Sequence, residues 1–267
     1  MTQQRTIKSW GDFIDIADTL LDVGPPTKTH YLFRGQSDAT WDLTPSFHRD
    51  AKPSKLSARQ LLEIEKAALK EFKAQAHLFL QPNMLNATSD VLAWWTIMQH
   101  HGAPTRLLDW TTSAYVAAYF ACAQNLDKVG AIWVLHAYSL EQEMKTRYGF
   151  EGLPDSDKQT EEFFLEEDAP PAIVMFERGN KTERMVAQQA VFSVCRNVSV
   201  GQHEILDAVL SEKSDITRFI KLLVPAEMKA AFLRKLRAMN VTASSLFPGI
   251  DGLGRSINEL IKLSALT

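Results

Sequence analysis

The segment from Gln99 to Ala121 constrains the fold most, because a dense polar run continues directly into an alanine-rich apolar run. Residues 99–113 contain two His, one Arg, one Asp, one Trp and three consecutive hydroxyl residues, and residues 114–121 are Ala-Tyr-Val-Ala-Ala-Tyr-Phe-Ala. Polar groups beside a core need hydrogen-bonding partners. Small side chains spaced three and four apart let a helix pack closely on a sheet. We therefore expect a helix against a sheet here, with a functional site or a structural polar network beside it.

Apolar periodicity predicts both helices and strands along the rest of the chain. Helical spacing occurs in residues 7–22, 57–80 and 89–101, and Gly24-Pro25-Pro26 ends the first of these helices, with Ser57 and Ser89 as expected N-caps of the other two. Extended segments are predicted at 30–36, 41–47, 105–110, 130–137, 173–176, 185–195 and 217–224. The order lacks a regular strand–helix–strand alternation. This favours an α+β fold with a mixed, mostly antiparallel sheet flanked by helices.

The length of 267 residues suits a single domain spanning 1–267. Within it we expect an N-terminal helix and linker at 1–26 and a mostly helical C-terminal part at 203–267. Residues 151–171 hold eight acidic residues, three prolines and one Lys. That composition predicts a long acidic loop or lid inserted in the domain.

Composition excludes several classes of function. A formal net charge of −3 gives no basic footprint for duplex nucleic acid. The two cysteines, Cys122 and Cys195, match no metal-binding spacing. Together with the lack of a signal peptide they predict a reducing cytoplasm, and the apolar runs are too short to cross a bilayer. We therefore expect a cytoplasmic protein with no membrane partner and no metal.

The histidine pair is the first candidate for chemistry. A helical projection from Val91 places His101 at the edge of the apolar face and points His100 away from it. His101 is therefore the candidate for an inward role, and the alternative is that it bonds the last helical carbonyls. Neighbouring histidines on one helix cannot both face one ion, which argues against a metal site.

Arg106 and Asp109 form the second candidate pair. Three residues apart on an extended segment, they point to opposite faces. Arg106 could hold a phosphate bidentately or a structural carboxylate, whereas Asp109 beside the turn favours a structural role. The hydroxyls of Thr111 to Ser113 are typical of a helix N-cap, and such an N-terminus can also receive an anion.

Arg34 and two glutamines complete the set. Arg34 ends an apolar strand before Gly35, so it needs an anionic partner, which is either a ligand or an internal carboxylate such as Asp109. Gly35 would let a ligand or another backbone approach closely. The predicted strand 185–195 places Gln188 and Gln189 on opposite faces, and each amide is expected to bond something specific.

These segments together resemble the FRG domain family. The resemblance rests on Phe33-Arg34-Gly35-Gln36, on Trp41-x-Leu43-x-Pro45-Ser46-x-x-Arg49, on the run from His100 to Thr111, on Arg184-x-x-x-Gln188-Gln189-x-x-Phe192 and on Ser245-Leu246-Phe247-Pro248. One departure is Ala190, where the family usually carries Gly.

The order of elements is also similar, at a lower level of specificity, to the ADP-ribosyltransferase fold. That resemblance implies that Arg34 binds the pyrophosphate of NAD and that Thr111 to Ser113 support the nicotinamide side. Gln188 or Gln189 would occupy the late-strand position where that fold carries a catalytic Glu. An amide stabilises a cationic transition state poorly, so the missing carboxylate is the main objection.

The sequence therefore predicts a cleft for an anionic, nucleotide-like small molecule. His101 and Gln189 are the expected catalytic residues, and the expected ligand-binding residues are Arg34, Gln36, Arg106, Thr111, Ser113 and Gln188. The leading function is NAD-dependent ADP-ribosyl transfer or NAD cleavage, with NAD as substrate and a protein or nucleic-acid acceptor left open. The alternative is a non-catalytic module that senses a nucleotide or nucleic acid in a bacterial or phage conflict system, as toxin or defence. A nuclease-like or metal-dependent enzyme is disfavoured because the sequence lacks a convincing acidic cluster.

Overall fold

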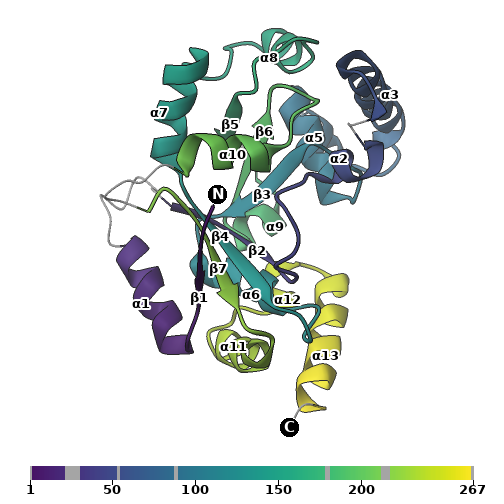
Figure 1. Ribbon diagram of the computed structural model, residues 1–267. Helices are drawn as coiled ribbons and strands as arrows, with labels where there is room; N and C mark the ends of the chain where they lie inside the picture. Colours follow the sequence, from purple (N-terminus) through teal and green to yellow (C-terminus); the bar gives the residue numbers. More distant parts are fainter. Residues whose placement is uncertain are drawn as a thin grey trace.

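A seven-stranded, mostly antiparallel sheet forms the centre of the molecule, within the residues that the computed structural model describes: 2–21, 31–52, 55–86, 90–177, 181–211 and 217–265. Its order is β1-β7-β4-β2-β3-β6-β5 (Figure 1), and the β1–β7 pair alone among these neighbours is parallel. This confirms the predicted α+β class. The strands are β1 (Gln3–Thr6), β2 (Tyr31–Gln36), β3 (Leu107–Thr111), β4 (Gly130–His136), β5 (Ile173–Phe176), β6 (Ala190–Cys195) and β7 (Phe219–Val224).

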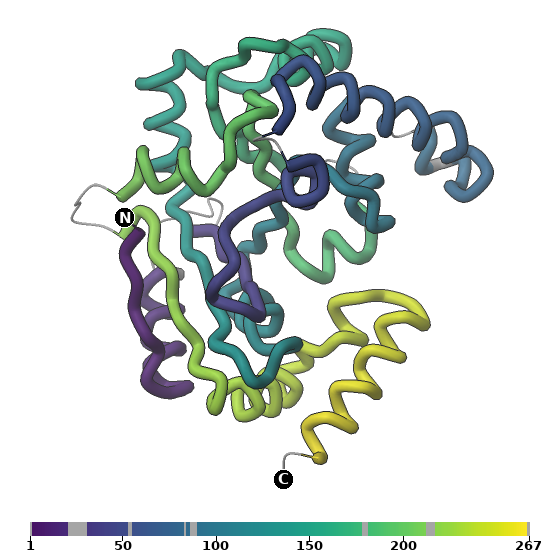
Figure 2. Tube along the Cα trace, turned by 45° about the vertical axis from the view of Figure 1, so that its right-hand side comes forward, coloured from purple at the N-terminus to yellow at the C-terminus, as the bar shows by residue number. Residues whose placement is uncertain are grey.

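Helices cover both faces of the sheet. One face packs against α1, α6 and α11, and the other packs against α7 and α10, while α5 and α8 lie against the β5–β6 end. Figure 2 shows α3 and α13 projecting from the same side of the molecule at opposite ends. The described helices are α1 (Trp10–Leu21), α2 (Ser46–Ala51), α3 (Ala58–Ala76), α4 (Pro82–Asn86), α5 (Val91–His100), α6 (Ala114–Cys122), α7 (Ala137–Tyr148), α8 (Asp157–Phe164), α9 (Glu183–Ala187), α10 (Gln202–Leu210), α11 (Ala226–Ala238), α12 (Ala243–Leu246) and α13 (Ile250–Ser264).

The alanine-rich helix α6 packs directly on β2, as the small-residue spacing predicts. Ala114, Ala117, Ala118 and Ala121 are all buried. A Cβ at Gly35 would lie 1.9 Å from the Ala117 carbonyl oxygen. Gly35 therefore admits the backbone of α6, which is the second of the two roles left open for it.

The sheet opens between β2 and β3. Along these two described strands the register pairs only Phe33 with Thr111, whereas β2 pairs with β4 along six positions from Tyr31 to Gln36. Where the strands separate, the Arg34 guanidinium donates to the Asp109 carbonyl oxygen at 2.6 Å. This seam joins two sections of sheet, β1-β7-β4-β2 and β3-β6-β5.

Most cap and boundary predictions are confirmed. Ser57 caps α3 with a full capping box, Ser113 caps α6, and α5 ends just before Gly102, whose φ is 84°. Asp90 is the N-cap of α5. Ser89 and Gly24-Pro25-Pro26 lie outside the described residues.

Three local predictions are wrong, and one strand was not foreseen. The segment 185–195 is not one strand, because Thr182 caps the short helix α9 and β6 begins only at Ala190. Segment 41–47 forms no strand, since α2 begins at Ser46. The acidic segment 151–171 is not purely a loop: Ser156 caps α8, which buries Phe164. The exposed strand β1 was not foreseen, because its four polar residues carry no apolar alternation.

No helix in the described ranges combines the length and apolar character needed to span a bilayer.

Candidate functional site

A cavity of about 800 Å³ opens beside the seam, between β2, the segment after it, the end of α6 and α13. We call it the seam cavity. The residues that line it are Arg34, Gly35, Gln36, Ser37, Trp41, Asp42, Thr44, Arg49, Tyr119, Phe120, Ala123, Gln124, Asn125, Phe247, Arg255, Asn258, Glu259 and Lys262.

Positive charge dominates the seam cavity. Its lining includes four cations, Arg34, Arg49, Arg255 and Lys262, against the carboxylates of Asp42 and Glu259. The nearest carboxylate to Arg34 is that of Asp109, with Oδ2 3.9 Å from the guanidinium, and burial lowers the pKa of Arg34. Among the described residues, no carboxylate lies within 4.0 Å of the other three cations. These cations are therefore available to an anionic ligand.

One cavity carboxylate is held by a phenol. The Tyr119 hydroxyl donates to Glu259 Oε1, and burial together with this carboxylate raises the pKa of Tyr119. Tyr119 stays protonated at neutral pH and fixes one carboxylate oxygen. The tyrosine comes from α6 and the glutamate from α13, so this bond also ties the cavity wall to the core.

Aromatic side chains line both sides of the seam cavity. Trp41 is 47% exposed, whereas Phe247 is buried. The Arg255 guanidinium carbon lies 4.5 Å above the Phe247 ring centre. An exposed indole beside cations offers a stacking surface to a heterocyclic base.

Three lysines hold the segment that carries Trp41. Lys229 donates to the Ser37 carbonyl at 2.7 Å, and Lys221 donates to the Ala39 carbonyl at 2.6 Å. Lys128 pairs with Asp38 at 2.6 Å and lowers the pKa of that carboxyl. Sequence reasoning missed all three. The sequence feature that points to them is Lys221 inside the apolar run Phe219–Val224, since a lone cation in a buried strand needs a specific acceptor.

The two predicted β2 residues both reach the seam cavity. Arg34 lies at its wall, as described above. Gln36 donates from Nε2 to the Asp42 carbonyl at 3.0 Å and accepts from the Trp133 indole at 2.6 Å. Both of its amide ends are engaged, so Gln36 shapes the cavity wall. Its role in binding a ligand stays a prediction.

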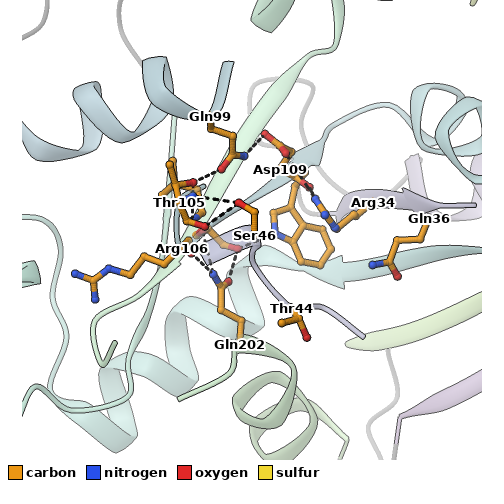
Figure 3. A network of polar contacts seen from close by, with 12 residues as sticks. Arg34, Gln36, Thr44, Ser46, Gln99, Thr105, Arg106, Asp109 and Gln202 are labelled. Atoms are coloured by element: carbon orange, nitrogen blue, oxygen red, sulfur yellow. Dashed lines mark hydrogen bonds and ion pairs between the residues drawn. The ribbon is translucent and has the colours of Figure 1, made fainter. Parts of the chain in front are cut away.

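The structure places Arg106 away from the seam cavity. Its side chain is 1% exposed and pairs with Glu65 Oε2 at 2.9 Å. The guanidinium also donates to the Arg196 carbonyl at 2.9 Å and stacks on Trp95 at 4.6 Å. In Figure 3 its guanidinium extends away from Arg34. Of its two open roles, holding a structural carboxylate is the one that the geometry presents.

The burial of the two histidines is the opposite of what the helical projection predicts. His101 is exposed, because α5 ends at His100 and the next residue leaves helical geometry. His100 is half-buried, and burial, with Arg184 and His101 nearby, lowers its pKa to about 4. Neither histidine lines the seam cavity.

Four other predicted residues also lie outside the seam cavity lining. Thr111 donates its hydroxyl to the Gln188 carbonyl, and Ser113 accepts from the Val116 N–H as the α6 cap. The Gln188 amide donates to the Leu246 carbonyl at 3.0 Å. Gln189, at a φ of 48°, accepts from the Thr112 hydroxyl at 2.9 Å. These groups connect α9, α12 and the seam to one another.

A polar network behind the seam orients Asp109 (Figure 3). The Gln99 amide donates to Asp109 Oδ1 at 2.7 Å and accepts from the Thr105 hydroxyl. The Thr105 backbone N–H donates in turn to the Ser46 hydroxyl at 3.1 Å. The Asp109 side chain remains 54% exposed. The polar run that opened the sequence analysis is therefore largely a structural network with Asp109 at its exposed end.

Comparison with protein families gives one match. The model of the FRG domain matches residues 29–129. Residues 29–129 are thus assigned to an FRG domain. The matched segment supplies β2, β3 and α6 of the FRG domain together with Trp41 and Arg49, but β4, which pairs with β2, begins just after it. Arg255, Glu259 and Lys262 lie outside the match, so the seam cavity combines FRG residues with the C-terminal helix. Searches among curated proteins and among solved structures gave no significant match.

Proposed function

We propose that the seam cavity of this FRG domain binds an anionic, nucleotide-like ligand. The observation that carries the proposal is the group of four cations around one cavity, three of them without a carboxylate within 4.0 Å among the described residues. Arg34 is half-buried and the other three cations are exposed, and phosphate or carboxylate oxygens are acceptors for guanidinium and ammonium groups alike. Trp41 adds a stacking surface for a base, and a volume of about 800 Å³ suits a ligand of this size.

NAD is the specific ligand that we propose, with NAD cleavage or ADP-ribosyl transfer as the reaction. Arg34 and Arg49 would hold the pyrophosphate. Breaking the bond between ribose C1 and the nicotinamide nitrogen builds positive charge on the ribosyl group, which a carboxylate stabilises better than an amide. Glu259 and Asp42 line the seam cavity and would supply that carboxylate in place of the late-strand glutamines.

Calorimetry with NAD tests the binding step. We expect NAD to bind the wild-type chain saturably. The affinity for NAD should be about tenfold to a hundredfold lower in the Arg34→Ala and Arg49→Ala variants, because each substitution removes charged hydrogen bonds. Arg59→Ala is the matched control, since Arg59 is 73% exposed and pairs only with Glu63 among the described residues. Unchanged affinity in both cavity variants would remove the proposal.

A nicotinamide-release assay separates the two functions. Release that is lost in Glu259→Gln or Asp42→Asn supports an enzyme. Binding of NAD without release supports the non-catalytic sensing module, which the positions of His101 and Gln189 outside the seam cavity also favour.

A further inference from the structure

A second cavity, of about 870 Å³, adjoins the seam cavity at Phe247. The two cavities share Phe247 and Arg255 in their linings. The second one also includes His100, His101 and Arg184, and nothing in the preceding proposal uses it. We call it the α5–α9 cavity, after the helices that supply or adjoin these residues.

Arg184 is the feature of this cavity that needs a partner. It is half-buried, and its guanidinium donates to the His100 carbonyl at 3.3 Å. Its guanidinium carbon lies 4.7 Å from the Phe247 ring centre, and Arg255 lies 4.5 Å from the same centre. Within the part of the chain that the structure describes, no carboxylate approaches Arg184 to within 4.0 Å. A half-buried, stacked guanidinium with one long hydrogen bond retains donors for an oxyanion.

The other charges around the α5–α9 cavity do not satisfy Arg184. Glu183 and Asp251 also line it, but neither is paired with Arg184. Lys181 lines it as well and is engaged with Glu177 at 2.7 Å. The accessible positive charge is therefore concentrated at Arg184 and Arg255, next to Phe247.

We propose that the α5–α9 cavity is a second phosphate-binding site, in which Arg184 is the principal donor and Arg255 assists from the shared wall. The phosphate has two conceivable sources. It belongs either to the far end of the ligand in the seam cavity or to a separate phosphorylated molecule bound beside it. The proposal does not depend on NAD being the first ligand.

Histidine NMR with inorganic pyrophosphate tests this site directly. His100 lines the α5–α9 cavity and not the seam cavity, so its imidazole signal reports on the second site. His101 lines the α5–α9 cavity and also an apolar cavity beside α3, so its signal serves as a second, less specific reporter. The signals are assigned by their loss in His100→Gln and His101→Gln. We expect saturable shifts on addition of pyrophosphate to the full chain, weakened about tenfold in Arg184→Gln, because one charged bidentate contact is lost.

Matched variants separate this site from the seam cavity. Arg255→Gln is also expected to weaken pyrophosphate binding, whereas Arg49→Gln and the exposed Arg59→Gln are expected to leave the two histidine shifts unchanged. Because Arg255 is exposed, its variant keeps the test valid if Arg184→Gln fails to fold. The absence of saturable shifts, or shifts equal to wild type in every folded Arg184 and Arg255 variant, overturns the proposal.

A parallel titration with NAD identifies the source of the phosphate. Histidine shifts that depend on both Arg49 and Arg184 indicate one ligand spanning the two cavities. With pyrophosphate binding intact, a lack of shifts with NAD indicates a separate phosphorylated molecule. If NAD fails to bind but pyrophosphate still shifts the histidines, the proposed function fails while the second site stands.

Discussion

Three arginines of this chain show how local surroundings decide the use of one side chain. Arg106 pairs with Glu65 and donates to backbone carbonyls, and only its buried Nε has no partner among the described residues. Arg34 donates one hydrogen bond to the Asp109 carbonyl and lines the seam cavity. Arg184 has one long bond and faces the α5–α9 cavity. A guanidinium has five donors, so the number left over separates a structural arginine from a binding one.

His100 makes stability depend on pH. Its pKa is lowered from 6.5 to about 4 in the folded chain, so the unfolded chain binds the proton first as the pH falls. The stabilisation of the folded chain that depends on a neutral His100 is fully present above pH 6.5. It is lost progressively as the pH falls toward 4, because the unfolded chain takes up the proton more readily. We expect His100→Gln to flatten this part of the profile of unfolding free energy, measured by urea denaturation between pH 7 and 4. An unchanged profile would contradict the prediction.

Gly35→Ala is expected to be strongly destabilising. The added methyl would meet the Ala117 carbonyl oxygen at 1.9 Å and the Ala121 nitrogen at 2.7 Å, which forces α6 away from β2 at a cost of about 3 kcal/mol or more. Gly254→Ala in α13 is the opposite case, because nothing lies within 4 Å of its added Cβ. Gly254→Ala should raise the free energy of unfolding by about 0.5–1 kcal/mol. Thermal denaturation of the two variants checks the pair.

At the scale of elements, α3 is tied to the sheet by a buried charge pair. Glu65 on α3 is 5% exposed, Arg106 just before β3 is 1% exposed, and the two atoms in contact lie 2.9 Å apart. Burial raises the pKa of Glu65. The pair fixes where α3 docks, because neither charge has an equivalent partner elsewhere among the described residues.

Removing one partner of this pair should cost more than removing both. We expect Glu65→Ala to destabilise by about 3–5 kcal/mol, since it leaves Arg106 buried without its carboxylate. The double variant Glu65→Leu with Arg106→Met should recover much of that loss, because it restores apolar packing. Urea denaturation measures both. A double variant less stable than Glu65→Ala would show that the carbonyl contacts of Arg106 dominate.

At the scale of the whole molecule, the β2–β3 seam separates two sections of sheet and carries the candidate site. Arg34→Ala removes the bond from the guanidinium to the Asp109 carbonyl. We expect the backbone amides at the Phe33–Thr111 pair, where β2 meets β3, to exchange faster with solvent deuterium in this variant. Amides between β4 and β7 should stay protected, because those strands pair along their length. Equal exchange in wild type and variant would show that the seam is held by packing alone.

Periodicity and capping chemistry specify much of the secondary structure of this chain. Ser57, Ser113 and the strand Gly130–His136 are found as predicted, because a cap or an apolar run acts over a few neighbouring residues. The FRG match to residues 29–129 confirms the resemblance for the motifs that lie within these residues. Predictions failed where local signals compete. Thr182 caps α9, which continues into the strand-like alternation of residues 185–195, and the helix forms there.

The sequence by itself determined the fold class, the packing of the alanine-rich helix on the sheet and the need of Arg34 for an acceptor. Only the tertiary structure decided that Arg106 turns toward Glu65, that His100 rather than His101 is half-buried, and that α13 contributes Arg255, Glu259 and Lys262 to the seam cavity. The physical reason is the distance along the chain over which each interaction acts. Caps and periodicity depend on residues within a turn or two of chain, whereas the partner of a buried charge is set by elements that meet only after the chain has folded.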